Sequence, residues 1–200
     1  LGANTTGTQN VAVGALSLDA NTTGSYNTAV GYTALGANTT ANNNTALGYA
    51  AMNANTTGAD SVAVGFGALD AQTTGGSNVA IGKDSMTSQT TGEFNVAVGR
   101  NTLASSTTAA GNVAVGDAAL YATTGNNNTG VGYGVLYENT TGTENVAVGR
   151  EALDSNTTGN YNTAVGMEAL ETNTTANNNT AVGHKALFAN TTGADNTAVG

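Results

Sequence analysis

Residues 27–43 read NTAVGYTALGANTTANN, and residues 162–178 read NTAVGMEALETNTTANN. The tripeptide Ala-Val-Gly, or a close variant of it, recurs along the whole chain with its glycine at 17-residue intervals. One interval, between Gly116 and Gly132, is a residue shorter. Self-similarity at a fixed short period is the signature of a repeat architecture, so the repeat decides the fold rather than any single residue.

Each of these units, called a rung below, is too short for two packed helices and their turns. Thr, Val, Gly and Asn are abundant while Glu, Lys and Arg are scarce, which disfavours helix. The length suits one coil of an all-β parallel β-solenoid with two short strands and two turns. We expect the first strand at sites such as residues 10–13, and the second at the Ala-Leu segment, such as residues 34–35, or at the Thr pair that follows. About twelve rungs stacked about 4.8 Å apart would give a rod of roughly 50 Å.

The repeat accounts for the entire chain as one unit. Residues 1–200 form a single tandem-repeat solenoid, and both ends fall partway through a rung, so we interpret the sequence as a window from a longer repeat protein. Residues 21–65 and 156–200 align without gaps, which indicates duplication of a block of rungs. The shortened rung is expected to lose its residue within residues 120–124, just before the Thr pair, so this stretch is predicted to be a turn.

Two rows of large apolar residues are predicted to form the core. The residue before the repeat glycine, called the Val row, is Val except at Leu47 and Ile81. The residue four places after the glycine, called the Leu row, is Leu or Met in every complete rung. We therefore expect Val98 to point inward, and Val98→Asp to disrupt neighbouring rungs. The glycine itself never varies, which predicts a positive φ angle or a backbone contact that no Cβ would permit.

The residue two places before the glycine, called the Ala row, is Ala in every rung except for Gly130. Neighbouring strand residues face opposite sides, so this row is predicted to point away from the Val row. A face held to such small residues is packed closely against something. Two interpretations stay open at this point, a tight bend within the coil and a second chain lying alongside.

Polar positions of the rung recur as well. The residue that opens the strand, called the strand-Asn row, is Asn in every rung except for Ser61, and its stacked amides are predicted to form a hydrogen-bonded ladder. The glycine after the Thr pair is Ala at positions 41, 109 and 176, usually with Asn next. The turn is therefore predicted to tolerate a left-handed residue at a shifted position.

The composition argues against several classes of protein. The net charge is −9, and four basic residues (Lys83, Arg100, Arg150 and Lys185) cannot neutralise a phosphate backbone, so we expect no nucleic-acid binding. No apolar run approaches the roughly 18 residues of a membrane span, so none is expected in this segment. Aromatic residues make up 5% of the chain, too few for a conventional globular core.

No catalytic, cofactor-binding or metal-binding residue is predicted, and we expect the chain not to be an enzyme. The only histidine, His184, stands in the variable row just after the glycine, which is expected to face solvent. Without cysteine, one histidine cannot build a Cys/His pair or a zinc site. Glu151 and Glu168 share a register one rung apart, where they could repel one another or hold a cation between the chains of an oligomer. A solvated acidic face is the interpretation that we favour.

The recurring Asn-Thr-Thr turn allows two further interpretations. It is an acceptor sequence for N-linked glycans in a secreted eukaryotic protein, and a plain turn in a bacterial or viral one, which we favour. Stacked Thr residues also raise ice binding as an alternative function. An ice-binding face needs Thr at alternate positions so that two rows share it, whereas adjacent Thr residues point opposite ways.

The strand and its glycine turn, such as residues 61–65 (SVAVG) and 78–82 (NVAIG), resemble the head repeats of trimeric autotransporter adhesins. Similar longer repeats occur in the shafts of phage tail-fibre-like proteins. The resemblance implies a left-handed parallel β-roll, three chains around one axis, and a role in adhesion or in spacing an adhesive tip. Each rung here is longer than the adhesin repeat, with the extra residues in or near the Asn-Thr-Thr-Gly turn.

Repeat and resemblance together predict an extracellular structural or adhesive fibre segment, acting as a rigid rod in a surface adhesin, tail fibre or filament. It would lie at a cell or virion surface. Its expected partners are further copies of the chain, as a homotrimer or a filament, and a host surface or extracellular matrix contacted through other parts of the chain. No cofactor is expected.

Overall fold

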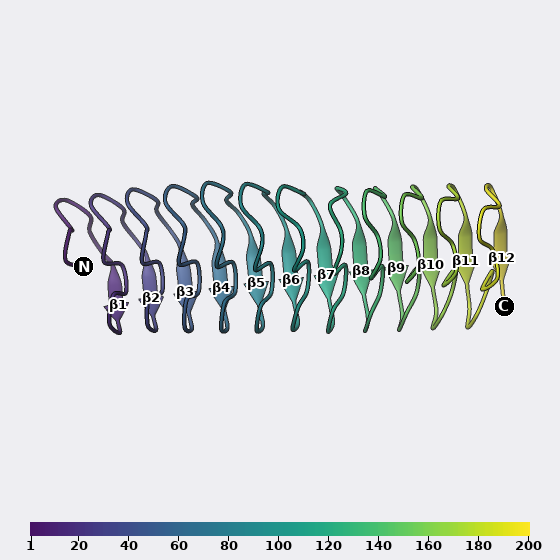
Figure 1. Cartoon of the computed structure of the whole chain (residues 1–200), viewed down its shortest axis with the longest axis horizontal. Helices are drawn as coiled ribbons and strands as arrows, with labels where there is room; N and C mark the ends of the chain where they lie inside the picture. The colour runs from purple at the N-terminus through teal and green to yellow at the C-terminus, as the bar shows by residue number, and fades with distance from the viewer.

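The computed structural model describes all of residues 1–200 and consists of twelve three-residue strands joined by turns, with no helix. Each strand pairs in parallel with the next, so the strands form one sheet along a rod (Figure 1). The pairing advances by one rung, with Ala29 beside Ala46. The strands are β1 (Val11–Val13), β2 (Thr28–Val30), β3 (Thr45–Leu47), β4 (Val62–Val64), β5 (Val79–Ile81), β6 (Val96–Val98), β7 (Val113–Val115), β8 (Thr129–Val131), β9 (Val146–Val148), β10 (Thr163–Val165), β11 (Thr180–Val182) and β12 (Thr197–Val199). The predicted parallel β-solenoid is confirmed.

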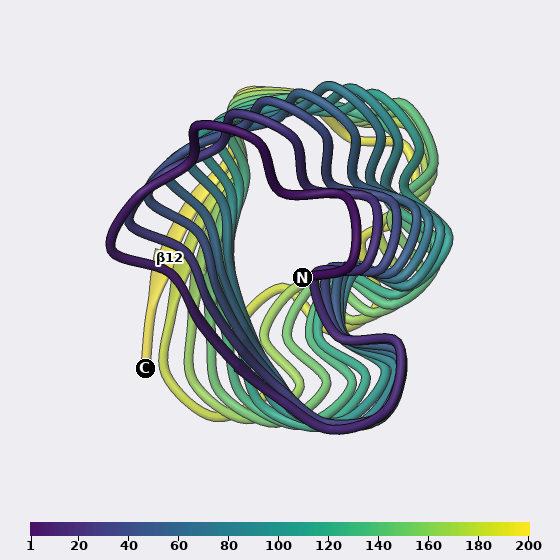
Figure 2. The same ribbon diagram turned by 90° about the vertical axis from the view of Figure 1, so that its left-hand side faces the viewer.

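The coil is left-handed. Seen from its N-terminal end, the chain runs counterclockwise as it recedes from the viewer, and successive rungs are slightly rotated about the axis (Figure 2). This is the hand that the resemblance to adhesin repeats implied.

Each rung holds one strand rather than the two that we expected. In the second rung, Thr33 and Leu35 have φ angles of 54° and 50°. Left-handed residues turn the chain and cannot continue a strand. The turn still bonds to the next rung, for example from Leu35 N to Ala51 O at 3.0 Å. The second strand was wrongly predicted because the residue types do not indicate that Leu takes a left-handed conformation here.

The core consists of the Ala row, the Leu row and the residue just before the Leu row. Ala29, Ala34 and Leu35 are fully buried in the second rung, and the same three rows form one apolar cluster along the rod. The Leu row is therefore confirmed as core. The Val row points outward instead: Leu47 is 48% exposed, and Val98 is partly exposed on the outer face. The prediction that Val98 is a core residue was wrong, since strand alternation fixes only that Ala and Val face opposite sides.

The interior of the coil is too narrow for a larger residue in the Ala row. At Gly130, a Cβ would lie 2.2 Å from Cδ1 of Leu120 and 3.0 Å from Cγ1 of Val135. Val135 stands where other rungs carry a smaller residue, usually Ala. The larger side chain of Val135 therefore accompanies the smaller Gly130 in the same rung. The small size of the Ala row is explained from within the coil, which removes the argument for a second chain packed against it.

The invariant glycine has both properties predicted for it. Gly31 has a φ of 135°, and a Cβ on it would lie 2.2 Å from the carbonyl oxygen of Gly48. The glycine after the Thr pair is different, because Gly24 does not have a positive φ. The left-handed residue of this turn comes two places later, as at Tyr26 and Asn43, so the prediction of a shifted left-handed residue was wrong.

Two ladders of buried amides run along the interior. In the strand-Asn row, Asn27 Oδ1 accepts from Asn44 N at 3.0 Å, and Asn27 Nδ2 donates to Ala41 O at 2.8 Å. The second ladder is the Asn before the Thr pair, called the turn-Asn row, where Asn38 Nδ2 donates to Asn21 Oδ1 at 2.8 Å. The first ladder was predicted, and the second was not.

The short rung keeps its interior intact. Thr123 is fully buried in the place of the turn Asn, and Thr124 Oγ1 donates to Thr140 O at 2.8 Å, as the first Thr of other pairs does to its neighbour. The missing residue is therefore the second, exposed Thr of the pair, not one before the pair as predicted. The stretch is a turn, as expected.

Candidate functional site

The outer face of the sheet is uncharged along the whole rod. It is formed by the Val row and by the residue three places before the glycine, which are Val, Thr, Leu or Ile in every rung. Both rows are at least partly exposed in all twelve strands. We call these two rows the flat face. Nothing in the single chain covers it.

The row just after the glycine lies beside the flat face and carries several large exposed side chains. Tyr32, Tyr49 and Phe66 stack with ring centroids 5.4 and 5.1 Å apart, and Lys83 Nζ lies 5.8 Å from the Phe66 ring centroid. His184, in the same row, is exposed as predicted. Neighbouring members of this row interact from Tyr32 to Lys83, so these side chains form a ladder on the surface of four successive rungs.

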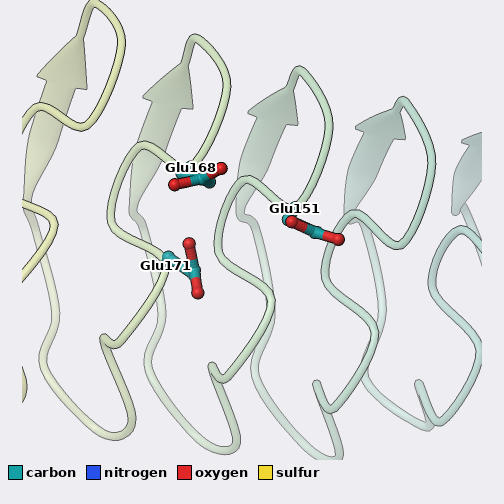
Figure 3. Close-up of side chains that lie close together, drawn as sticks. All are labelled: Glu151, Glu168 and Glu171. Carbon is teal, nitrogen blue, oxygen red and sulfur yellow. The ribbon is translucent and has the colours of Figure 1, made fainter.

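A cluster of carboxylates lies next to Arg150, a member of this row. Glu151 follows β9, and Glu168 and Glu171 follow β10, at the turns of two successive rungs (Figure 3). One oxygen atom from each can lie within 4.8 Å of the others. The approach of Glu151 and Glu168 was expected from their shared register. Glu171 was missed, because it joins them across a turn, three residues after Glu168.

Basic side chains already balance much of this cluster. Arg150 binds Glu151 at 2.7 Å and reaches Glu168 at 3.8 Å, while Lys185 Nζ lies 3.1 Å from Glu168. Burial, followed by the charges of Glu168 and Glu151, raises the pKa of Glu171. Three oxygen ligands are fewer than a calcium ion takes, so this cluster acts first as a network of surface ion pairs.

Next to the cluster lies a shallow pocket of about 190 Å³. Its lining residues come from three successive rungs: Ala118, Tyr133, Gly134, Tyr137, Glu151 and Asp154. Asp154 forms no ion pair and accepts no side-chain hydrogen bond. Burial, and to a lesser degree the charges of Glu138, Glu151 and Glu171, raises the pKa of Asp154 to about 6. This pocket was not predicted from the sequence, since its opening depends on a glycine between two tyrosines.

The Thr pairs present one exposed row rather than two. In the second rung Thr40 is exposed, while Thr39 Oγ1 donates to Thr56 O at 3.1 Å in the next rung. The Asn before each pair is an interior residue: Asn38 and Asn156, for example, are fully buried. A glycan on these buried amides would be incompatible with the folded rod.

No helix in this structure is long and apolar enough to cross a membrane. Searches against protein-family models, curated proteins and solved structures found no match for the chain.

Proposed function

We propose that this chain is a rigid rod segment of an extracellular fibre, in a surface adhesin, tail fibre or filament, and that its role is mechanical rather than enzymatic. The observation that carries the proposal is the unbroken pairing of neighbouring rungs from β1 to β12, reinforced by amide ladders inside the coil. The stability of such a solenoid is approximately a sum over rung interfaces, so no single residue is indispensable. Placement at a cell or virion surface and an adhesive role follow from the resemblance of the rungs to adhesin head repeats.

Self-association through the flat face is part of this proposal. Charged residues are depleted at the centres of protein interfaces, and the flat face has none. Three residues per strand and twelve rungs give an area of about 10 Å by 50 Å, or about 500 Å² per copy. A standard interface buries about 800 Å² per partner, so the neighbouring row with Tyr32, Tyr49 and Phe66 has to contribute to a stable trimer or filament.

Light scattering combined with small-angle X-ray scattering tests both parts. We expect an elongated particle with a mass that is a multiple of the chain mass. The double variant Val98→Lys and Val115→Lys places charge on the flat face and should give single rods. Thr91→Lys and Thr108→Lys, on the exposed Thr row of adjacent rungs, are the matched control and should still associate.

A compact particle would contradict the rod, and a wild-type monomer at high concentration would contradict self-association. The same preparation tests the ice-binding alternative by thermal hysteresis. Thermal hysteresis that grows with concentration, and that Thr91→Lys and Thr108→Lys abolish, would replace the mechanical role with ice binding.

A further inference from the structure

The pocket beside the acidic cluster combines an opening, aromatic walls and an uncompensated carboxylate. Tyr133 and Tyr137 lie in one rung on either side of Gly134, and Asp154 comes from the next rung. Gly134 is the one glycine that lines this pocket. The arrangement goes beyond what a mechanical rod needs.

Gly134 opens the pocket. A Cβ on this residue would have ordinary contacts only, 3.6 Å from Cγ of Glu151 and 3.9 Å from Oδ1 of Asp154. The same register carries Thr33 and Asn101 in other rungs, with φ angles of 54° and 55° against 60° at Gly134. The backbone therefore does not require glycine here, and the missing side chain leaves room beside the Asp154 carboxylate.

The walls are aromatic and the open side faces solvent. Tyr137 stacks on Tyr121 of the preceding rung, with ring centroids 5.1 Å apart and planes 11° apart, which fixes its orientation. Tyr133 is 56% exposed. Aromatic rings attract organic cations through the negative charge on their faces, most strongly where a ligand loses water on binding.

The charge in the pocket is negative. Glu151 is neutralised by Arg150 at 2.7 Å, whereas Asp154 has no basic partner. Burial raises the pKa of Asp154 because it disfavours the charged carboxylate. A neighbouring cation therefore stabilises this carboxylate more than it would stabilise an exposed one. Metal ions prefer a shell of oxygen ligands, and only Glu151 and Asp154 offer carboxylate oxygens in this lining.

From this geometry we propose that the pocket of Tyr133, Gly134, Tyr137 and Asp154 binds a small organic ammonium group, of the quaternary or methylated kind. The two tyrosines contact the methyl groups, and Asp154 supplies the opposite charge. The pocket contains no residue of the flat face, although Tyr133 belongs to the row just after the glycine that lies beside it.

The test is a titration of the intact chain with tetramethylammonium chloride at constant ionic strength, followed by NMR of the tyrosine ring signals. We expect saturable shifts of Tyr133 and Tyr137, with binding that weakens as the pH falls below about 6. Asp154→Asn should weaken binding roughly tenfold, the loss of one charge-assisted contact. Gly134→Thr should fill the pocket and weaken it at least as much.

Gly67→Thr is the matched control, since Gly67 occupies the same register with a φ of 63° but lies outside the pocket. It should leave binding unchanged. The proposal is overturned if wild-type shifts do not saturate, if Asp154→Asn binds as tightly as wild type, or if calcium chloride displaces the ligand at equal ionic strength. Should Gly134→Thr not fold, Asp154→Asn alone decides.

A trimethylammonium group can be free or part of a lipid headgroup. Free choline and phosphatidylcholine vesicles separate these sources, each measured against Asp154→Asn. Choline binding that the variant loses supports a soluble ligand, and vesicle binding that the variant loses supports a membrane headgroup. Binding of neither overturns the proposal.

Discussion

The turn-Asn row differs between the two ends of the rod and its middle. Near the N-terminal end, each Asn from Asn21 to Asn55 donates to the one before it, at 2.8 to 3.2 Å. Near the C-terminal end, the bonds from Asn156 to Asn139 and from Asn173 to Asn156 measure 2.8 and 2.9 Å. In the middle the row consists of Gln72, Gln89, Ser106 and Thr123, and no side-chain hydrogen bond joins these four to one another. The coil keeps its course through both regions, so the backbone pairing and the Ala and Leu rows determine the fold, while the ladder adds stability.

In the middle region, some buried polar side chains find hydrogen-bond partners outside the turn-Asn row. Ser61 is the one short residue of the strand-Asn row, and Gln72, in the same rung, is longer than the Asn that it replaces. Gln72 Nε2 reaches Ser61 Oγ at 3.4 Å, and Gln72 Oε1 accepts from Asn78 at 3.0 Å. Further along, Gln89 Oε1 and Ser106 Oγ are buried without a partner. We therefore expect the rungs around Gln89 and Ser106 to be the least stable part of the interior.

The largest expected effect comes from breaking the regular ladder. Asn156 makes three buried hydrogen bonds, to Asn139 Oδ1, to Gly159 O and from Asn173 Nδ2. Asn156→Ala should lower the free energy of unfolding by about 3 kcal/mol, because each lost bond leaves a buried partner unpaired. Gln89→Ala, which loses one hydrogen bond to Ala109 O, should cost about 1 kcal/mol. Urea denaturation followed by circular dichroism measures both, and equal losses would show that the two regions do not differ.

The second effect concerns how the middle region packs. Gly130→Ala should destabilise the rod by about 2 kcal/mol, since the new Cβ meets Leu120 and Val135. Adding Val135→Ala restores the pair of alanines that Ala29 and Ala34 form in the second rung. The double variant should therefore be more stable than Gly130→Ala alone. A double-mutant cycle on the free energies of unfolding measures this coupling, and strict additivity would contradict a shared core volume.

These two regions also show how far the sequence predicts the structure. The invariant glycine, the Leu row and the strand-Asn ladder were predicted because each depends on a property of the residue itself. The placement of Val98 was wrong, because alternation along a strand does not say which side of a narrow coil is the inside. The left-handed Leu35 was not foreseen, since Leu does not favour that conformation.

The candidate site was harder to predict than the fold. The shared register of Glu151 and Glu168 was visible in the repeat. The position of Asp154 was not, because it meets Glu151 and Gly134 only after the left-handed turns fold the rung back. A search for a glycine outside the repeat pattern, followed one rung later by two carboxylates three residues apart, would have indicated the pocket.

A smaller effect of opposite sign is expected from repairing the middle region. Ser106→Asn would place an amide in the turn-Asn row beside Gln89, whose Oε1 has no hydrogen-bond partner. We expect a gain of about 1 kcal/mol in the free energy of unfolding, the usual net value of one buried hydrogen bond. Ser155→Asn, at a partly exposed position outside the ladder, serves as the control and should change little. A loss of stability in Ser106→Asn would show that the interior there is too narrow for an amide.

The smallest effect depends on pH and involves the border between the middle region and the C-terminal ladder. Asp154 precedes Asn156 by two residues, and burial raises its pKa from 3.8 to about 6 in the folded chain. The folded state therefore binds the proton more tightly than the unfolded state, so this group stabilises the fold below pH 4 and loses that contribution as the pH rises towards 6. Because Asp154 is only half-buried, solvent screening reduces the effect to about 1 kcal/mol.

Asp154→Asn should abolish this slope and raise the stability at pH 7, as measured by urea denaturation between pH 4 and pH 7. Asp195→Asn, an exposed change of the same kind near the C-terminal end, is the control for net charge. Hydrogen exchange can then locate the effect: at pH 7 the amides of Leu153 and Asn156 should gain protection in Asp154→Asn, while Asn21 in the N-terminal ladder should not. An equal gain in protection at both sites would mean that the charge of Asp154 acts on the whole rod. The rungs would then have to unfold as a single unit rather than as neighbours with separate stabilities.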